Sequence, residues 1–377
     1  MSDVISLLRD LVAIDSVSAH SNVAVATHLR GLLEARGFRV KVLPYEDGAG
    51  VKKQNLVALA GPETATPGEG GLCFVGHTDT VPYDPEWTDA LVLTERDGKL
   101  YGRGSADTKA FIAAVLAATE GLDVSTLAHP LACVFTADEE VGCLGAKRLV
   151  EASAIRPRHA IVGEPTELVP IRAHKGYWLA EVTVKGTEAH SAYPALGRPA
   201  IFHAARLLVR LEAVAKELEG DADPAFSPPF TTLNVGTISG GKARNMIPGS
   251  CSFPVEWRPI PWQDGELVPR LVAREIASLR AQDASFDAEV RVVRRDPGVA
   301  TAPDAPIIRF LEAETGKEVS TISFGTELPY LTALGAQGCV CGPGDIRQAH
   351  RTGEFVPRAQ LEQAVGIYRR AIERFCR

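Results

Sequence analysis

The sequence predicts a mixed α/β fold with a second, smaller domain inserted into the first. Apolar runs alternate with helical patterns up to about residue 174 and again after residue 293, as in a mainly parallel sheet covered by helices. Between these stretches the predicted order is strand, helix, strand, strand, helix and strand. The length of 377 residues also exceeds what one compact core usually contains, which favours two domains.

The first stretch has the pattern of a buried sheet with helices. Apolar residues recur at helical spacing over 3–15 and 21–36, and Gly37 ends the second of these helices. The run Leu72-Cys73-Phe74-Val75 is continuously apolar, as a parallel strand buried on both faces should be. The other elements predicted here are strands at 38–43, 55–60, 131–136 and 159–162, helices at 108–120 and 144–152, and a loop at 61–71.

The middle stretch has the order of a ferredoxin-like domain, βαββαβ. The predicted strands are 177–185, 231–238, 251–258 and 286–294, and the predicted helices are 199–218 and 266–282. A Pro-rich loop, DADPAFSPPF, occupies 221–230. After this stretch the α/β pattern returns, with helices at 305–315, 328–335 and 358–376 and strands at 319–323 and 338–341.

Composition excludes several functional classes. The net charge is −7, from 40 Lys and Arg against 47 Asp and Glu, and no basic block occurs, which argues against a nucleic-acid partner. The first residues, MSDVISLLRDLVAIDSV, lack the basic start and long apolar core of a secretory signal. No run of 18 apolar residues occurs, so no membrane span is expected. We therefore expect a cytoplasmic protein.

The cysteines agree with a reducing compartment. There are seven, an odd number, and most lie within apolar, strand-like runs, so we expect reduced and buried thiols. Cys339 and Cys341 alternate on a predicted strand and share a face. A single C-x-C pair without further ligands is a weak metal signal, and we interpret the two as core residues.

Five segments place metal-ligand residue types after predicted strands or Gly-rich turns. The segments are His77-Thr78-Asp79, Gly104-Ser105-Ala106-Asp107, Asp138-Glu139-Glu140, Gly163-Glu164-Pro165 and Gln348-Ala349-His350. Ligands of an open α/β sheet gather outside the carboxyl ends of its strands. Two divalent cations with one carboxylate left over are the equipment for hydrolysing an amide bond. The five segments together therefore predict a two-metal hydrolytic site.

Taken singly, each segment has a structural interpretation. His77 and Asp79 could be a surface His-x-Asp pair, Asp107 a helix N-cap, and Glu139 with Glu140 a solvated acidic turn. Glu164 and His350 could each be ordinary loop residues. Their joint occurrence favours the metal site, in which His77 and His350 lie on opposite sides of the middle stretch. Residues 1–174 and 293–377 then form one catalytic domain, and 175–292 is an insertion into it.

The motifs resemble the dizinc amidohydrolase family that includes acetylornithine deacetylase, succinyl-diaminopimelate desuccinylase, aminoacylase and the glutamate carboxypeptidases. The resemblance covers essentially the whole chain. Its segments are, in order, GHTDTVP (76–82), GRGSADTKAF (102–111), TADEEVGCLGA (136–146), GEPT (163–166), GTEAHSAYPALGRPAI (186–201), GGKARNMIPGSC (240–251) and GPGDIRQAHRTGEFV (342–356). The segment SFGTELPYLTALG (323–335) most resembles the acetylornithine deacetylase branch. Ser105-Ala106 and Thr108 depart from the pattern, because relatives often carry Cys and Met there; these residues do not ligate.

The resemblance implies roles for individual residues. Asp107 would bridge two divalent ions, with zinc expected and cobalt or manganese as alternatives. One ion would add His77 and Glu164, and the other Glu140 and His350. The resemblance also makes Glu139 the general base, Asp79 the support of His77, and the peptide bond after Asp107 cis.

The resemblance also implies how substrate is recognised. The insertion would act as a lid and form a homodimer, with His190 of one subunit reaching the active site of the other. Asn245 and Arg258 would join His190 in substrate recognition, and Gly325 and Thr326 would contact the substrate carboxylate. Glu327, directly after this pair, is our candidate for recognising a cationic amine; the alternative is a Glu that starts a helix.

The implied reaction is hydrolysis of N2-acetyl-L-ornithine to acetate and L-ornithine, a step of arginine biosynthesis. A near alternative is a related amidase acting on a different small N-acyl amino acid or peptide, such as acetylcitrulline, succinyl-diaminopimelate or a dipeptide. A distant alternative is a non-catalytic homologue that binds metal or peptide. Glu139 argues against the distant alternative, because a binding module has no need of a base beside a full ligand set.

Overall fold

The computed structural model describes residues 3–62 and 70–377, and contacts between residues divide them into two compact units. The first unit comprises residues 1–172, 301–320 and 326–377, and the second comprises 173–300 and 321–325. The part of the predicted 61–71 loop that spans 63–69 lies outside the described residues. Each unit is described by itself below.

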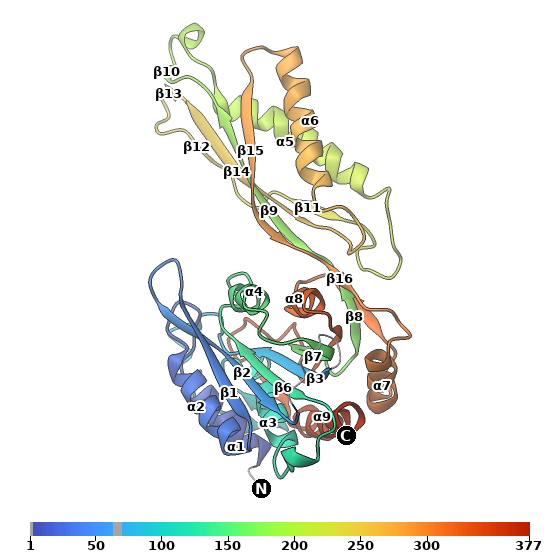
Figure 1. Ribbon diagram of the computed structural model, residues 1–377. Helices are drawn as coiled ribbons and strands as arrows, with labels where there is room; N and C mark the ends of the chain where they lie inside the picture. The colour runs from blue at the N-terminus through green and yellow to red at the C-terminus, as the bar shows by residue number, and fades with distance from the viewer. Residues whose placement is uncertain (1–2, 63–69) are drawn as a thin grey trace. The chain divides into compact units, whose positions relative to one another are not determined.

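The first unit is built on a mixed sheet whose central strands are parallel (Figure 1). The order is β1-β2-β6-β3-β7-β18-β8. The pairs β6/β3, β3/β7 and β7/β18 are parallel, whereas β1/β2, β2/β6 and β18/β8 are antiparallel. The bounds are Arg39–Glu46 (β1), Lys52–Ala60 (β2), Gly70–His77 (β3), Leu131–Thr136 (β6), Pro157–Pro165 (β7), Ile171–His174 (β8) and Gln337–Gly342 (β18). This confirms the predicted fold class.

Helices cover both faces of this sheet (Figure 1). On one face α3 packs against α1 and α9; on the other α4 packs against α8. The bounds are Val4–Val12 (α1), Val23–Glu34 (α2), Lys109–Ala118 (α3), Leu144–Glu151 (α4), Pro306–Thr315 (α7), Leu328–Ala333 (α8) and Arg358–Cys376 (α9). Every residue of α3 is buried, because the helix lies between the sheet and two other helices.

An aromatic cluster packs α3 and α9 against the central strand β3. The ring of Phe111 lies 6.2 Å from that of Phe74 and 5.2 Å from that of Tyr368. Gly163 on β7 makes this packing feasible, since a Cβ atom there would lie 2.1 Å from the ring of Phe111. The packing therefore depends on a glycine directly before the candidate ligand Glu164.

The sequence did not predict a small antiparallel sheet in the first unit, β19-β5-β4. Its strands are Thr94–Arg96 (β4), Lys99–Tyr101 (β5) and Phe355–Pro357 (β19). Strands of three residues are too short to show an alternating pattern. The sheet joins the segment before Asp107 to the segment after His350, since Phe355 pairs with Tyr101.

The second unit has the predicted βαββαβ order. Its antiparallel sheet has the order β11-β14-β9-β15, with α5 and α6 contributing to one apolar core. The bounds are Tyr177–Lys185 (β9), Ala200–Leu218 (α5), Thr232–Asn234 (β11), Ser250–Arg258 (β14), Leu267–Gln282 (α6) and Asp287–Asp296 (β15). Short strands at Ala189–His190 (β10) and Met246–Ile247 (β13) form a separate ladder, and Ser239–Gly240 (β12) pairs with β14.

The unit boundaries differ from the predicted 174/175 and 292/293. The predicted boundary at 292 falls inside β15, which stays paired with β9 as far as Asp296. Val299–Ala300 (β16) also belongs to the second unit, as do residues 321–325 within and after Ser320–Ile322 (β17). The predicted strand 286–294 already crosses the predicted boundary, and β15 extends beyond that strand through Arg295 and Asp296.

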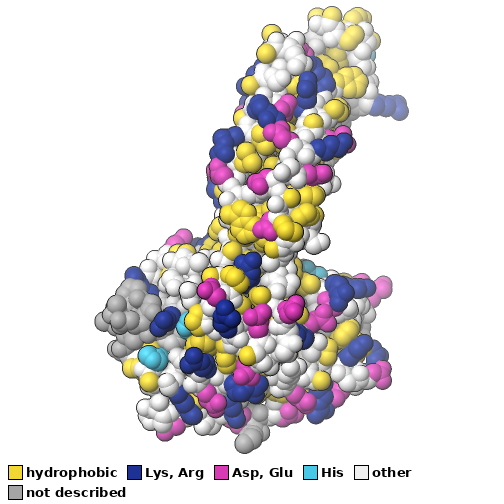
Figure 2. Space-filling model, turned by 90° about the vertical axis from the view of Figure 1, so that its right-hand side faces the viewer, with side chains coloured by type: hydrophobic (Ala, Val, Ile, Leu, Met, Phe, Trp, Pro, Cys, Tyr) yellow, Lys and Arg dark blue, Asp and Glu magenta, His cyan; other side chains and the backbone are white. Residues whose placement is uncertain are grey.

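All seven cysteines are free and buried, as expected. No helix among residues 3–62 and 70–377 is long and apolar enough to cross a membrane. On the face shown in Figure 2, basic and acidic side chains are interspersed.

Candidate active site

Four neighbouring parallel strands end at one edge of the sheet, and the ligand candidates follow from them. His77 is the last residue of β3, and Glu164 is the residue before the last of β7. Because Val75 pairs with Val162, continuing the register places His77 beside Glu164. Thr136, which ends β6, pairs with His77, so the Asp138-Glu139-Glu140 turn begins at the same edge. The parallel strands thus deliver these groups together, as predicted from the carboxyl-end rule.

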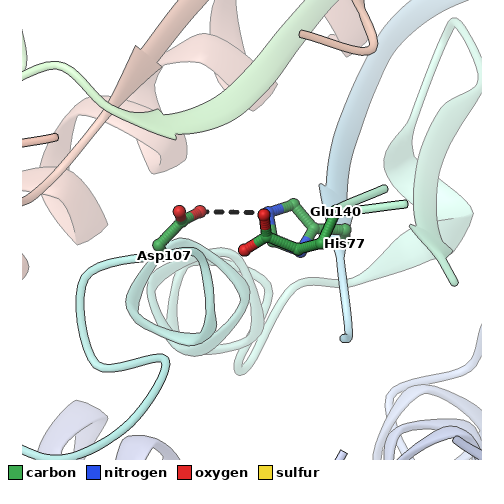
Figure 3. A group of neighbouring side chains, drawn as sticks. All are labelled: His77, Asp107 and Glu140. Carbon is green, nitrogen blue, oxygen red and sulfur yellow. Dashed lines mark hydrogen bonds and ion pairs between the residues drawn. The ribbon is translucent and has the colours of Figure 1, made fainter. Parts of the chain in front are cut away.

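Asp107 lies between the two histidines. Its Oδ1 is 3.0 Å from Nε2 of His77, and its Oδ2 is 3.3 Å from Nε2 of His350. His350 also lies 3.0 Å from Oε1 of Glu140. One ligand atom from each of His77, Asp107 and Glu140 lies within 4.8 Å of the others (Figure 3). The two oxygens of one carboxylate therefore face two ligand groups, which is the geometry that a bridging carboxylate requires.

Glu354 holds the loop that carries Asp107, a role the sequence did not reveal. Its Oε1 accepts hydrogen bonds from the backbone N–H groups of Ala106 and Asp107, at 2.9 and 3.0 Å. Its Oε2 accepts from the backbone of Gly104 and from Arg103, at 2.9 and 2.7 Å. The peptide bond between Asp107 and Thr108 is cis, as the resemblance led us to expect. In the sequence, Glu354 is a lone acid before a short strand, and no local pattern marks its partners.

Asp79 contacts both His77 and the Glu139-Glu140 turn. Nδ1 of His77 bonds to the backbone oxygen of Asp79 at 2.9 Å, whereas the Asp79 carboxylate lies farther away, at 3.6 Å. That carboxylate instead accepts the backbone N–H groups of Glu139 and Glu140, at 3.1 and 3.3 Å. Asp79 therefore supports His77 through its main chain rather than its side chain, because the carboxylate is committed to the Glu139-Glu140 turn.

Glu139 is a partly buried acid beside the ligand candidate Glu140. Burial raises the pKa of the Glu139 carboxyl to about 8; the neighbouring His77 charge opposes the rise, and the negative charges of Glu140, Glu327 and Asp79 add to it. The Cys143 thiol donates to its Oε1 at 3.3 Å. A carboxyl group whose pKa lies near neutrality is suited to accept and return a proton.

The charges of the site fit bound cations. Burial raises the pKa of Glu164 well above its usual value, and burial also raises the pKa of Glu140, in both cases with the Asp107 charge adding to the effect. Hydrogen bonds with Asp107 and then Glu140 raise the pKa of His350 to about 10. The raised pKa of His350 shows that the neighbouring acids favour positive charge here, and metal ions would supply such charge. Imidazole and carboxylate groups together suit zinc, cobalt or manganese.

Thr326 and Glu327 lie in the first unit, where α8 begins. The Thr326 hydroxyl accepts a hydrogen bond from the backbone N–H of Leu328 at 3.1 Å. Glu327 is only 1% exposed, and neither carboxylate oxygen has a hydrogen-bond partner of ordinary geometry among the described residues. Burial raises the pKa of Glu327 to about 7, although the facing Thr136 hydroxyl and the His77 charge oppose the rise. The residue does occupy the start of a helix, but its side chain does not cap it.

The other predicted substrate-binding residues lie in the second unit. His190 on β10 pairs with Met246, and the backbone oxygen of Asn245 accepts from Ser191 at 3.0 Å, so His190 and Asn245 lie close together. Arg258 ends β14, which starts at Ser250 just after this ladder. At ~3.3 Å per residue, the two ends of β14 are roughly 26 Å apart. Gly325 also belongs to this unit, and the contact of these four residues with substrate stays a prediction.

Comparison with known proteins agrees with this geometry. The profile of peptidase family M20/M25/M40 matches residues 73–374. The chain belongs to this family. A relative from Myxococcus xanthus named acetylornithine deacetylase is 52% identical and aligns over 100% of this chain and 99% of its own length.

Solved structures share the fold. A tripeptidase from Staphylococcus aureus superposes with a TM-score of 0.78 at 22% identity, covering 98% of this chain and 97% of its own. A Bacillus subtilis protein described as a dinuclear metal-binding peptidase from this family superposes with a TM-score of 0.68 at 15% identity, covering 98% and 97%.

Proposed function

We propose that the chain is a metal-dependent amidohydrolase that hydrolyses N2-acetyl-L-ornithine to acetate and L-ornithine, a step of arginine biosynthesis. One observation carries the proposal. The carboxylate of Asp107 faces both His77 and His350, with Glu139 beside Glu140, in a chain that is 52% identical over its length to a protein named acetylornithine deacetylase. Amide hydrolysis requires a polarised carbonyl, an activated water and a proton donor for the departing amine, and this set of groups suits all three.

We propose two divalent ions at the site, with zinc first and cobalt or manganese as alternatives. Asp107 would bridge them, His77 and Glu164 would complete one ligand set, and Glu140 and His350 the other. The two oxygens of Asp107 that face different histidines support this assignment. When bound, such ions polarise the amide carbonyl and lower the pKa of the attacking water.

Glu139 is proposed to move the proton. Its carboxylate takes a proton from the attacking water and returns it to the departing α-amino nitrogen. Asp79 holds Glu139 in place through the backbone N–H, at 3.1 Å. Without cations, burial raises the pKa of Glu139 to about 8. Bound cations would lower that pKa, because they favour the carboxylate form.

Gly325 and Thr326 are proposed to hold the substrate carboxylate, and Glu327 to recognise the cationic δ-amine. A charge preference is useful only where the acid is shielded from water, since an exposed pair is worth about 0–1 kcal/mol. The 1% exposure of Glu327 and its unpartnered oxygens support the proposal. The amine would then meet a carboxylate that no described residue neutralises by direct pairing.

We further propose a homodimer formed through the second unit. Several large apolar side chains on and before α5 are exposed, including Phe202 at 72% and Val209 at 66%. A set of exposed apolar residues on one element is typical of an interaction surface. The separation of His190 and Asn245 from Arg258 also supports a dimer, because one small substrate cannot reach both ends of β14. In a dimer the two ends can serve different active sites, with His190 acting across the subunits.

A cytoplasmic location is proposed on the cysteines. All seven are free and buried, which suits a compartment that keeps thiols reduced.

Acetate release tests the proposed reaction. The protein, supplied with zinc or cobalt, is assayed on N2-acetylornithine, acetylcitrulline and acetyl dipeptides, with succinate release measured from succinyl-diaminopimelate. We expect the highest kcat/KM on N2-acetylornithine. A higher value on another substrate would replace the substrate assignment, and binding of substrate without any turnover would favour the non-catalytic alternative.

A further inference from the structure

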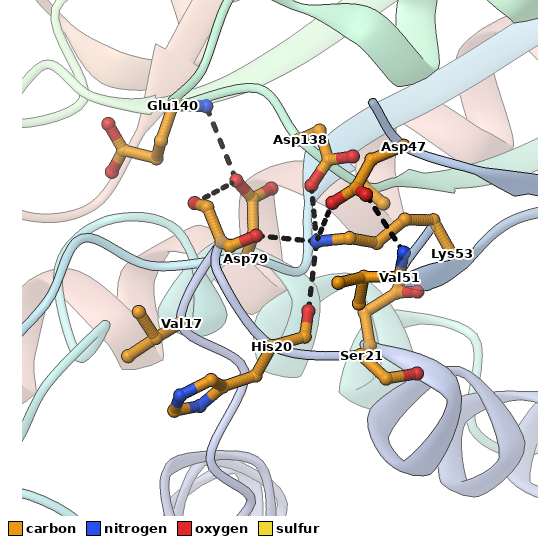
Figure 4. Close-up of polar contacts among 12 residues, drawn as sticks. Val17, His20, Ser21, Asp47, Val51, Lys53, Asp79, Asp138 and Glu140 are labelled. Carbon is orange, nitrogen blue, oxygen red and sulfur yellow. Dashed lines mark hydrogen bonds and ion pairs between the residues drawn. The ribbon is translucent and has the colours of Figure 1, made fainter. Parts of the chain in front are cut away.

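A buried lysine lies behind the metal-ligating turn. Lys53 on β2 is only 1% exposed, although its neighbour Lys52 is exposed. Burying an ammonium group is costly unless its three protons find acceptors. They do: Nζ donates to the backbone oxygens of Ser18 and His20, at 2.5 and 2.8 Å, and to Asp138 at 2.7 Å (Figure 4). Lys53 thus joins a loop near the start of the chain to the acidic turn.

One branch of this network runs through Ser18 to Asp79. The backbone oxygen of Ser18 accepts from Lys53, and the Ser18 hydroxyl donates to Oδ2 of Asp79 at 2.7 Å. Asp79 in turn accepts the backbone N–H groups of Glu139 and Glu140. Lys53 therefore fixes the residue that orients Asp79, and Asp79 fixes the turn.

The other branch runs directly to the turn through Asp138. This residue precedes Glu139 and has a positive φ of 57°, a conformation that needs support in a residue other than glycine. Its Oδ1 accepts from Lys53 and its Oδ2 from the Tyr45 hydroxyl, at 2.7 and 3.0 Å. Both carboxylate oxygens are thus held, and with them the start of the Glu139-Glu140 turn.

We propose that Lys53 is a positioning residue that sets where Glu139 and Glu140 stand, by clamping both Asp138 and the Ser18–Asp79 pair. Its polar partners include none of the residues proposed to bind metal or substrate. The inference rests on the proposed function, because it assigns Glu140 to a metal and Glu139 to proton transfer. Groups that orient ligands in this way typically contribute 10–100-fold to metal affinity or activity.

The experiment compares Lys53→Met with Lys52→Met, a matched change at the exposed neighbour on the same strand. Zinc is titrated into each metal-free protein by calorimetry, and kcat, KM and Tm are measured on the zinc-loaded proteins. For Lys53→Met we expect affinity for one of the two ions to fall by about 10–100-fold, with a similar fall in kcat. KM should stay within about threefold, since Lys53 does not contact the proposed substrate residues. Lys52→Met should match the wild type in every measurement.

A loss of protein stability in Lys53→Met must be separated from a displacement of Glu139 and Glu140. Lys53→Met leaves Asp138 buried without its cation, so the double variant Lys53→Met/Asp138→Asn removes the unpaired charge as well. Leu33→Ala, a core change in α2 away from the network, gives the effect of lower Tm alone. Positioning predicts that the double variant regains Tm but not zinc affinity, and that Leu33→Ala lowers Tm but keeps zinc affinity. Wild-type zinc affinity and kcat in Lys53→Met, or a matching loss in Leu33→Ala, would overturn the proposal.

Ser18→Ala keeps the proposal testable if Lys53→Met fails to fold. It removes the hydroxyl that reaches Asp79 but leaves the backbone oxygen that accepts from Lys53. We expect a smaller loss of zinc affinity and kcat in the same direction, and unchanged values would contradict the Ser18 branch. Failure of the proposed function can be distinguished from failure of the Lys53 proposal. If the function is wrong, the wild type binds zinc without releasing acetate, and the zinc titration still tests Lys53.

Discussion

The two units of the molecule differ in where several acids are buried together. In the first unit, acids such as Asp107, Glu164 and Glu327 are buried at one edge of the sheet. In the second unit, ion pairs such as Arg274 with Glu217 lie at the surface, with about half of each side chain exposed, 49% and 50%. Burying a charge without full compensation costs stability, whereas a surface pair costs and contributes little. The first unit thus concentrates buried acids at the candidate active site, whereas the Arg274–Glu217 pair of the second unit is an ordinary solvated contact.

Burial explains why the pKa values of these first-unit acids are displaced. Burial raises the pKa of Glu139, Glu140 and Glu164, and proximity to one another adds to the effect. Displaced acids gathered at the carboxyl ends of strands are typical of active sites. The predictions below test whether the buried acids act in chemistry and whether the surface pairs do not.

The largest effect is expected from Glu139→Gln. Removing the proposed general base should lower kcat by about 10²–10⁴-fold while zinc still binds, because Glu139 is not an assigned ligand. Calorimetric zinc titration and acetate release measure the two properties separately. Glu151→Gln, an exposed acid on α4, is the matched control and should keep full activity. A Glu139→Gln protein with more than a tenth of the wild-type rate would remove Glu139 from its assigned role.

Mixing two inactive variants tests whether the second unit completes the site of its partner. His190→Ala and Glu139→Ala subunits should each be inactive as homodimers. After equal mixing with full exchange, half of the dimers are mixed and each has one working site of two, so about a quarter of wild-type activity should return. No recovery despite demonstrated exchange would place His190 outside the partner's site.

Glu327→Gln should make the metal-free protein more stable at neutral and alkaline pH. Burial raises the Glu327 pKa from 4.5 to about 7, so between these values the folded state binds more protons than the unfolded state. Wild-type stability therefore falls as pH rises through this window, and above it the charged acid costs up to about 3 kcal/mol that Gln does not. Denaturant unfolding of both proteins at pH 4, 6 and 8 measures the difference, which should be near zero at pH 4. Equal stability at pH 8 would contradict an unpaired charge.

The same variant tests substrate choice. Glu327→Gln should lower kcat/KM for N2-acetylornithine and spare acetylcitrulline, whose side chain is neutral. Equal losses on both substrates would show that Glu327 only supports the start of α8.

The smallest effect is expected in the second unit. Arg274→Gln removes the surface ion pair between Arg274 on α6 and Glu217 on α5. The change should alter the free energy of unfolding by about 0–1 kcal/mol and leave kcat unchanged. A loss of activity would mean that this surface contributes to the site and would weaken the contrast between the units.

The sequence predicted the fold and the sheet edge well because both depend on local patterns. Continuous apolar runs marked β3 and β6, and residues directly after them, His77 and the Asp138-Glu139-Glu140 turn, were predicted to share an edge. The ferredoxin-like order of the second unit followed from clear alternation and helical periodicity. The predicted boundary at 292 cuts the predicted strand 286–294 itself, and β15 continues as far as Asp296.

The supporting groups could not be predicted, because their partners lie far apart in the chain. Glu354 accepts from Asp107, 247 residues away, and Lys53 donates to Asp138, 85 residues away. Nothing in the sequence near Lys53 distinguishes it from exposed Lys52, since burial of a charge depends on which carbonyl groups converge on it. Asp79 was expected to support His77, and it does so through its backbone oxygen, while its carboxylate accepts from the turn.

The most direct test is metal reconstitution followed by acetate release. Metal-free protein receives zinc in steps from zero to three ions per chain, and hydrolysis of N2-acetylornithine is measured at each step. The account predicts no activity without zinc, binding that saturates at two ions per chain, and full activity by that point. Full activity in the chelator-treated protein, or no acetate at any zinc loading, would contradict the assignment of His77, Asp107, Glu140, Glu164 and His350 to a two-metal hydrolytic site.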